Sequence, residues 1–303
     1  MKMLKTLSAI AAALALAGCI RDNRDDCLFP LRLHFTYLYN VEDTDLFSDE
    51  VETLCLYLYD TETGTLAASR SMTAAELDDD NSTVWLVPPG RFSLVTWGGV
   101  KSRYDIDPGM SLDAMALSIN ADPQTGSVAQ DREHLWHNLT TDLLVNGDLT
   151  PGYDIDLHKL SNDVTVTIAA TEGTSLPYHP SSSITAANGT CDAYGKIPDG
   201  TPATLYAPQV EALSRADMLP GSVHSYTTMA LADGDGSHLN VDLGDTTVFD
   251  GSLTDLIGEN PGIDFDLLDD FQVYFLITPG DDRLDVAVSI NGWQVTEYDV
   301  TLR

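Results

Sequence analysis

Positive charge is scarce in this sequence. Its 303 residues contain 15 Lys+Arg against 47 Asp+Glu, which gives a formal net charge of −32 and a pI near 4.1. No nucleic acid is expected as a partner, because binding DNA or RNA needs clustered basic side chains. A surface this acidic also repels anionic lipid headgroups. Electrostatic attraction would therefore not hold the protein at a membrane.

Long apolar runs are also missing. The uncharged stretch at residues 7–16 is too short to cross a hydrocarbon core about 30 Å thick, which needs roughly 20 apolar residues. It follows Lys2 and Lys5, a pattern typical of a signal peptide. The next residues, Leu-Ala-Gly-Cys19, resemble the bacterial lipobox. We therefore expect cleavage of residues 1–18 and lipidation of Cys19, leaving 13 Lys+Arg, 47 Asp+Glu and a net charge of −34.

Cysteine is rare and carries no metal-site spacing. Besides Cys19, the chain has only Cys27, Cys55 and Cys191, with no C-x-x-C pair. A zinc site is not expected. Cys55 lies in an apolar run and is expected in a core. Export would permit a disulfide, but three thiols leave one over, so no bridge is assigned.

Catalytic patterns are missing as well. No Gly-x-Ser-x-Gly string occurs. A loop beginning at Asp233 opens like a calcium-binding EF-hand, but His238 stands where Gly is required and Gly244 where a carboxylate is required. His134 and His137 lack the His-Glu-x-x-His order and are expected to pack or to face solvent. We expect no catalytic residue, metal ligand, cofactor or small-molecule substrate.

What the sequence does contain is a series of short strand patterns. Residues 31–39 alternate apolar and polar side chains, and residues 51–60 are apolar at both parities, as in a strand covered on both faces. Two further strands, 83–87 and 91–96, flank Pro88-Pro89-Gly90 and are expected to form a hairpin. In the second half the same pattern predicts five more strands, at residues 164–169, 240–243, 271–278, 284–290 and 293–302. Only short helices are expected, at 73–77 and 112–117, so the fold class is all-β, with antiparallel sandwiches.

The length left after cleavage, about 285 residues, exceeds what one core usually serves. The strand pattern restarts near Leu160. We therefore expect a signal peptide (1–18), a lipidated tether (19–30), an N-terminal β-sandwich domain (31–160) and a C-terminal β-sandwich domain (161–303).

The C-terminus carries the strongest turn signal. Asn291-Gly292 separates two strand patterns, and a type I′ hairpin turn needs positive φ at both positions. A shift of apolar parity predicts a β-bulge between Val295 and Tyr298. All four tryptophans are expected in cores with their indole N–H groups hydrogen-bonded, namely Trp85, Trp97, Trp136 and Trp293.

Several stretches together resemble the FimB-like fimbrial anchor lipoproteins of Bacteroidota. They are the lipobox followed by Asp25-Asp26-Cys27-Leu28, the strand at 51–60, Val87-Pro-Pro-Gly-Arg-Phe-Ser-Leu-Val-Thr-Trp-Gly98, Leu135-Trp-His137, the strands flanking Leu160 and Val288-Ser-Ile-Asn-Gly-Trp293. Each is only a strand with a turn, but they occur in the family's order over nearly the whole chain.

The resemblance implies two transthyretin-like antiparallel β-sandwich domains in tandem. It also implies a lipid-anchored protein of the cell outer membrane, exposed at the surface, that holds a fimbrium through contacts with fimbrial stalk subunits. The alternative is a surface glycan-binding lipoprotein of a polysaccharide uptake system, which would need an exposed row of aromatic side chains. An outer-membrane hydrolase has the least support.

Overall fold

The structure is a computed structural model that describes residues 27–128, 132–147, 151–213 and 221–302. The predicted signal peptide and Cys19 lie outside the described residues. Strands dominate, and the described chain has only two short α-helices, α2 (Phe47–Glu50) and α3 (Leu253–Gly258). None of the helices in the described part is long and apolar enough to span a membrane. The all-β fold class is confirmed.

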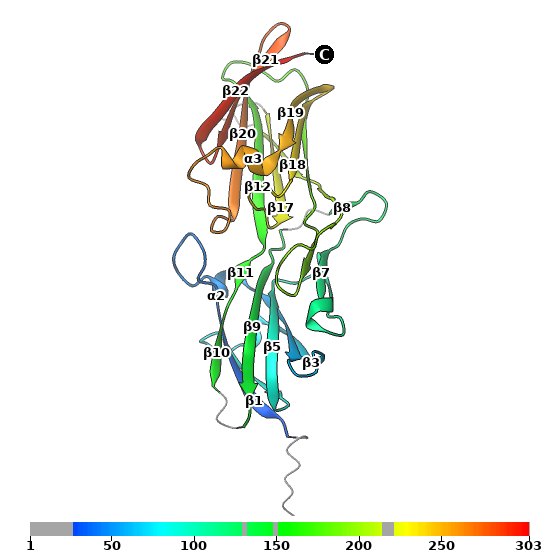
Figure 1. Ribbon diagram of the computed structural model, residues 1–303. Helices are drawn as coiled ribbons and strands as arrows, with labels where there is room; N and C mark the ends of the chain where they lie inside the picture. Colours follow the sequence, from blue (N-terminus) through cyan, green and yellow to red (C-terminus); the bar gives the residue numbers. More distant parts are fainter. Residues whose placement is uncertain (1–26, 129–131, 148–150, 214–220, 303) are drawn as a thin grey trace, which may run out of the picture.

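The chain builds an elongated molecule with one β-sandwich above another (Figure 1). The lower sandwich packs a three-stranded sheet, order β10-β1-β4, against a five-stranded sheet, order β11-β9-β5-β2-β3. Its strands are β1 (Phe29–Thr36), β2 (Thr53–Asp60), β3 (Leu66–Thr73), β4 (Ser82–Val87), β5 (Gly90–Gly98), β9 (Trp136–Val145), β10 (Gly152–Asp156) and β11 (His158–Lys159).

Strand β2 explains why residues 51–60 are apolar at both parities. Leu54, Leu56 and Leu58 point into the core of the lower sandwich. The alternate residues, including Tyr57 and Tyr59, face the other way and pack into a second, larger core. A small sheet, order β14-β7-β6, contributes Leu117 and other side chains to that core, so the central sheet is covered on both faces. Its strands are β6 (Tyr104–Asp107), β7 (Ala116–Ile119) and β14 (Thr190–Asp192).

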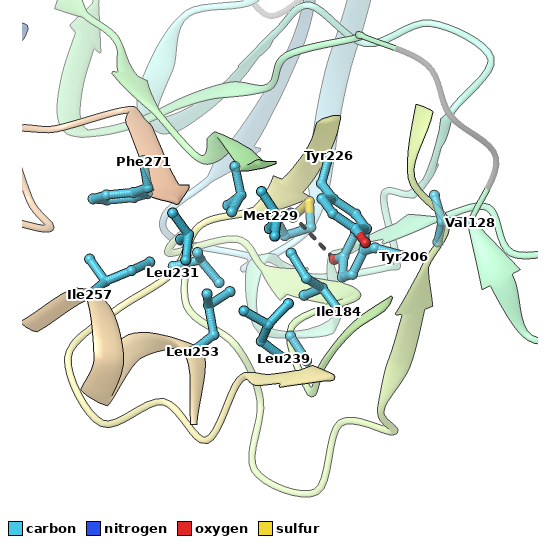
Figure 2. Packing of buried hydrophobic residues seen from close by; sticks show 14 of the residues in the cluster. Val128, Ile184, Tyr206, Tyr226, Met229, Leu231, Leu239, Leu253, Ile257 and Phe271 are labelled. Atoms are coloured by element: carbon cyan, nitrogen blue, oxygen red, sulfur yellow. Dashed lines mark hydrogen bonds between the residues drawn. The ribbon is translucent and has the colours of Figure 1, made fainter. Parts of the chain in front are cut away.

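The upper sandwich holds most of the larger core. A six-stranded sheet, order β16-β17-β12-β20-β21-β22, packs against a five-stranded sheet, order β19-β18-β13-β15-β8. Figure 2 shows the apolar side chains between them, with the Met229 amide donating to the Tyr206 hydroxyl at 3.3 Å. The strands are β8 (Ser127–Val128), β12 (Ser161–Ala170), β13 (Pro180–Ala186), β15 (Thr204–Tyr206), β16 (Gln209–Leu213), β17 (Gly221–Met229), β18 (His238–Leu243), β19 (Thr246–Ser252), β20 (Asp270–Pro279), β21 (Arg283–Ile290) and β22 (Trp293–Thr301).

Backbone pairing crosses the boundary expected near Leu160. Strand β7 pairs with β14, and β8 joins the upper sandwich beside β15, so parts of residues 99–128 are held by strands that follow residue 160. Division into domains 31–160 and 161–303 therefore stays a prediction. Expressing 31–160 alone would remove β14, one of the two partners of β7, and β15, the partner strand of β8.

Two local predictions were wrong. Strands β4 and β5 do not form a hairpin, because β4 pairs with β1 in one sheet while β5 pairs with β2 and β9 in the other. Two consecutive prolines cannot donate ladder hydrogen bonds and end β4, and the chain then passes from one sheet to the other. The expected helices are 3₁₀ turns, η2 (Ala74–Glu76) and η3 (Leu112–Ala114), and residues 116–117 belong to β7.

The predicted burial of the tryptophans was right for three positions. Trp85, Trp97 and Trp136 are buried, whereas Trp293 is 57% exposed at the start of the edge strand β22. The indole nitrogens of Trp97 and Trp136 have no hydrogen-bond partner, contrary to expectation. Apolar burial therefore outweighs the unpaired N–H at these two positions.

Candidate interaction surfaces

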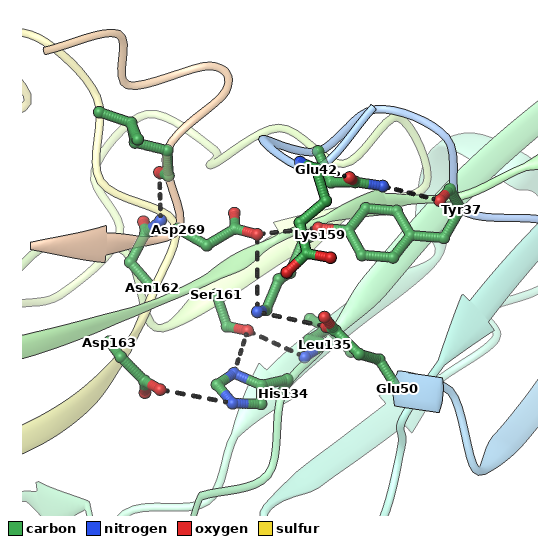
Figure 3. A network of polar contacts seen from close by, with 12 residues as sticks. Tyr37, Glu42, Glu50, His134, Leu135, Lys159, Ser161, Asn162, Asp163 and Asp269 are labelled. Carbon is green, nitrogen blue, oxygen red and sulfur yellow. Dashed lines mark hydrogen bonds and ion pairs between the residues drawn. The ribbon is translucent and has the colours of Figure 1, made fainter. Parts of the chain in front are cut away.

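A polar network joins the two sandwiches (Figure 3). The Lys159 ammonium lies 3.5 Å from a carboxylate oxygen of Glu50 and 3.5 Å from one of Asp269, and its side chain is only 10% exposed. It also lies over the Trp136 ring, 5.8 Å from the centroid. Because Glu50 belongs to α2 and Asp269 directly precedes β20, this one cation connects the lower sandwich to the upper.

Tyr37, which directly follows β1, reinforces the connection. Its hydroxyl donates to the Asp269 carboxylate at 2.8 Å. Burial and the nearby negative charge of Asp269 raise the pKa of Tyr37, so its proton stays in place to donate. Asp269 is thus held by both a cation and a neutral donor.

A second part of the network surrounds His134. Ser161 Oγ accepts from the Leu135 amide at 3.1 Å and lies 3.2 Å from His134 Nδ1. The other ring nitrogen lies 3.5 Å from Asp163. Burial lowers the pKa of His134, while burial and the charge of Asp163 raise that of Asp270. These side chains hold the chain in place where it passes from β11 to β12, which is a structural role.

A groove of about 420 Å³ opens beside this network, lined by Lys101, Arg132, Lys159 and several carboxylates. Its walls are polar, with charges of both signs. Within the described ranges, no three His, Cys, Asp or Glu side chains are grouped so that they could hold a metal ion. Asp235, in the loop that resembles an EF-hand, instead accepts from the backbone of Ser237 and Ala232.

His137 lies in β9 and is buried, and His134 lies in the coil just before that strand. Neither histidine is on a helix. The Nε2–H of His137 donates to the Ala193 carbonyl at 3.0 Å, and its ring packs 4.5 Å from that of Trp97. Burial lowers the pKa of His137 from 6.5 to about 4. Cys191 is likewise buried in the core, which raises the pKa of its thiol to about 12. A thiol with so high a pKa is not reactive, because the thiolate is the nucleophile.

The low pKa of His137 predicts a pH dependence of stability. The unfolded chain binds a proton at this ring near pH 6.5 but the folded protein only near pH 4, so stability is lost as pH falls through that window. We expect the melting temperature to fall less steeply between about pH 7 and about pH 4.5 in His137→Gln, whose amide can still donate to Ala193. Parallel curves for the parent and the variant would contradict this.

The C-terminal strand ends at the end of the molecule opposite the N-terminal strand (Figure 1), and the turn that precedes it lies beside the start of β20. Asn291 and Gly292 have φ of +49° and +78°, and Ile290 pairs directly with Trp293 across the turn. The register then shifts, with Ser289 opposite Gln294 and Val288 opposite Thr296. The extra residue is therefore Val295, at the start of the interval where a bulge was expected.

Strand β22 is the edge of its sheet and, within the described chain, pairs with β21 alone. The Tyr298 hydroxyl donates to the Val248 carbonyl at 3.0 Å, which ties this edge to the facing sheet. Val295, Tyr298 and Val300 pack partly buried against the core. The last strand is thus part of the upper sandwich, with one free edge.

The junction residues were not found from the sequence. Lys159 lies next to the predicted domain boundary, and its partner Asp269 lies 110 positions away along the chain. Both residues lie in segments whose charged composition is typical of solvent-exposed loops, and no spacing pattern distinguishes them.

The described cysteines are free: Cys27 is exposed, Cys55 half-buried and Cys191 buried.

Together, the sandwiches, the polar network and the open edge strand describe a β-sandwich protein whose polar contacts have a structural role. The family model described as "Fimbrillin-A associated anchor proteins Mfa1 and Mfa2" matches residues 24–299. The chain therefore belongs to this fimbrial anchor family, as the resemblance implied. This family comprises structural proteins and is not a class of enzymes.

Solved structures share the fold. The fimbrial anchor protein Mfa2 from Porphyromonas gingivalis matches with a TM-score of 0.72 and 19% identity, over 90% of this chain and all of that one. A putative adhesin from Bacteroides ovatus matches with a TM-score of 0.73 and 18% identity, over 88% and 95%. A protein from Bacteroides thetaiotaomicron described as a putative polysaccharide binding protein matches with 0.70 and 19%, over 89% and 97%. No curated protein matches.

Proposed function

We propose that this chain anchors a fimbrium at the bacterial surface as an outer-membrane lipoprotein. The observation that carries the proposal is the separation of the two ends of the molecule. Strand β1, which follows the lipobox segment, starts at the tip of the lower sandwich, and the C-terminal strand ends at the far end of the upper one (Figure 1). Lipid attachment and fimbrial contact can then occur at opposite ends without competing.

Lipidation of Cys19 is the part of the proposal tested most simply. Cys19→Ser should release the protein from the membrane fraction or leave an unprocessed precursor, because the thiol that receives the diacylglycerol is gone. Cell fractionation and gel mobility measure this, with Cys27→Ser as the matched control. An unchanged membrane fraction and mobility for Cys19→Ser would contradict lipid anchoring.

At its other end, we propose that the chain receives a strand from a fimbrial stalk subunit or docks against its surface, and does not donate its own last strand. The pairing of β22 with β21 and the Tyr298 contact to Val248 support this. The free edge of β22 could accept a strand. An adhesive or anchoring role of this kind needs no catalytic residue.

Deleting residues 293–303 should unfold the upper sandwich. The deletion removes Val295, Tyr298 and Val300 from the core and exposes β21, at a cost of more than about 3 kcal/mol. Thermal unfolding measures the effect, with Trp293→Ala as the control because that side chain is largely exposed. A truncated protein that kept its melting temperature but no longer joined fimbriae would show that the last strand is a donor arm.

A glycan-binding role, the alternative, would draw on aromatic side chains at the surface. Three of the four tryptophans lie in the cores and cannot form a sugar platform. Trp293 is the exception, on the edge strand. No feature of the described surface favours this second function over anchoring.

A further inference from the structure

The lower end of the three-stranded sheet carries an exposed apolar surface. Leu28, Val84 and Leu86 are 57%, 44% and 58% exposed, although large apolar side chains are usually buried. Pro30 is the pairing partner of Leu86, and Arg32 is that of Val84. Directly opposed residues in a ladder project from the same face. Pro30, Leu86, Arg32 and Val84 therefore share the outer face of the sheet, and Leu28 directly precedes β1 at the same end. We call Leu28, Pro30, Arg32, Val84 and Leu86 the basal patch.

The charge of the basal patch is unusual for this protein. Its five residues include no carboxylate, in a chain with 47 Asp+Glu against 15 Lys+Arg. Asp78, Asp80 and Asp154 line a hollow beside Arg32 and Val84, so the carboxylates border the patch and are not part of it. Arg32 is exposed, and no ion pair joins it to any carboxylate in the described ranges. Apolar side chains next to an unpaired guanidinium match a lipid surface, where acyl chains lie beneath phosphate groups.

A strand from another protein fits this site less well. The free edge of β4 would be the place to add one, but the guanidinium of Arg70 donates to the Val84 carbonyl at 3.4 Å. In the register of β4 with β1 this carbonyl faces away from β1, so Arg70 occupies part of the hydrogen-bonding row that an added strand would need. The patch is thus suited to contact through its face.

The position of the patch indicates which lipid surface it meets. Cys19 precedes Cys27, the first described residue, by eight positions. Even a fully extended segment of this length reaches only about 28 Å, so a lipid on Cys19 would keep the patch close to its leaflet. So short a link raises the effective concentration of membrane at the patch, and a weak apolar contact then suffices for binding.

We propose that the basal patch seats in the headgroup and acyl boundary of the leaflet that holds the lipidated Cys19. Leu28 and Leu86 insert among the acyl chains, and Arg32 contacts lipid phosphate. This contact fixes the tilt of the body against the membrane, so that a force on the upper end is resisted by the patch as well as by the lipid on Cys19. The inference rests on the proposed lipid anchoring.

The test places a tryptophan in the patch. Lipidated full-length protein carrying Trp293→Phe to reduce background, with Leu86→Trp added, is reconstituted into phosphatidylcholine vesicles with or without brominated acyl chains. We expect blue-shifted emission that brominated lipid quenches. Val210→Trp, at a similarly exposed position of β16 in the upper sandwich, is the matched control and should be neither shifted nor quenched. Val84→Trp repeats the test if Leu86→Trp does not fold.

The outcomes separate this inference from the anchoring proposal. Protein that floats with the vesicles while Leu86→Trp stays unquenched overturns the seating of the basal patch and leaves lipid anchoring intact. Protein that does not float overturns anchoring itself, and the inference with it. Emission that shifts only when purified fimbrial subunits are added would assign the patch to a protein partner and refute the lipid contact.

Discussion

Replacing Trp97 with alanine should destabilise the protein by about 3–5 kcal/mol, the usual cost of truncating a fully buried indole. Trp97 has no exposed surface and lies in β5 between β2 and β9, where its ring packs against His137. It belongs to the core that continues from the lower sandwich into the upper one, so the cavity would weaken both. Urea unfolding measures the loss.

The control for Trp97→Ala is the same change at an exposed indole. Trp293→Ala should alter the free energy of unfolding by less than about 0.5 kcal/mol, because surface substitutions rarely do more. Equal losses at the two positions would contradict the assignment of Trp97 to the core and Trp293 to the surface.

Replacing Lys159 with methionine should cost about 2–3 kcal/mol, because removing one partner leaves a partly buried charge uncompensated. Glu50 and Asp269 would lose their shared cation, with Asp163 and Asp270 close by. Methionine keeps most of the packing against Trp136, so the change isolates the charge. The expected loss becomes smaller at high salt, which screens the repulsion among the carboxylates.

Lys101→Met is the matched control for the junction. Lys101 pairs with Glu52 at 2.8 Å, a shorter distance than either contact of Lys159, but its side chain is 40% exposed. An exposed pair contributes little, so this variant should lose less than about 1 kcal/mol. If the two lysine variants were equally destabilised, the Lys159 network would not be what joins the sandwiches.

Local patterns predicted much of the fold. The alternation in residues 31–39 correctly placed Leu31, Leu33 and Phe35 in a core, although Tyr39 lies beyond the strand and is exposed. The apolar run of β2 correctly indicated a strand covered on both faces. These features depend on period-two geometry, which the sequence displays directly.

Partner choice could not be predicted in the same way. Nothing local to Pro88-Pro89 shows that β4 and β5 join different sheets, and nothing local to Trp293 shows that it begins an edge strand and is exposed. The Lys159 to Asp269 contact likewise depends on how the sandwiches stack. Such features arise from long-range packing, on which turn chemistry and strand alternation carry no information.

Anchoring itself is tested most directly by locating the protein on fimbriated cells. Immunogold electron microscopy with an antibody to this chain should place gold at the cell-proximal end of fimbriae, and Cys19→Ser cells should shed fimbriae that carry gold at one end. Gold distributed along the shafts, or on surface sites that bear no fimbria, would contradict an anchor.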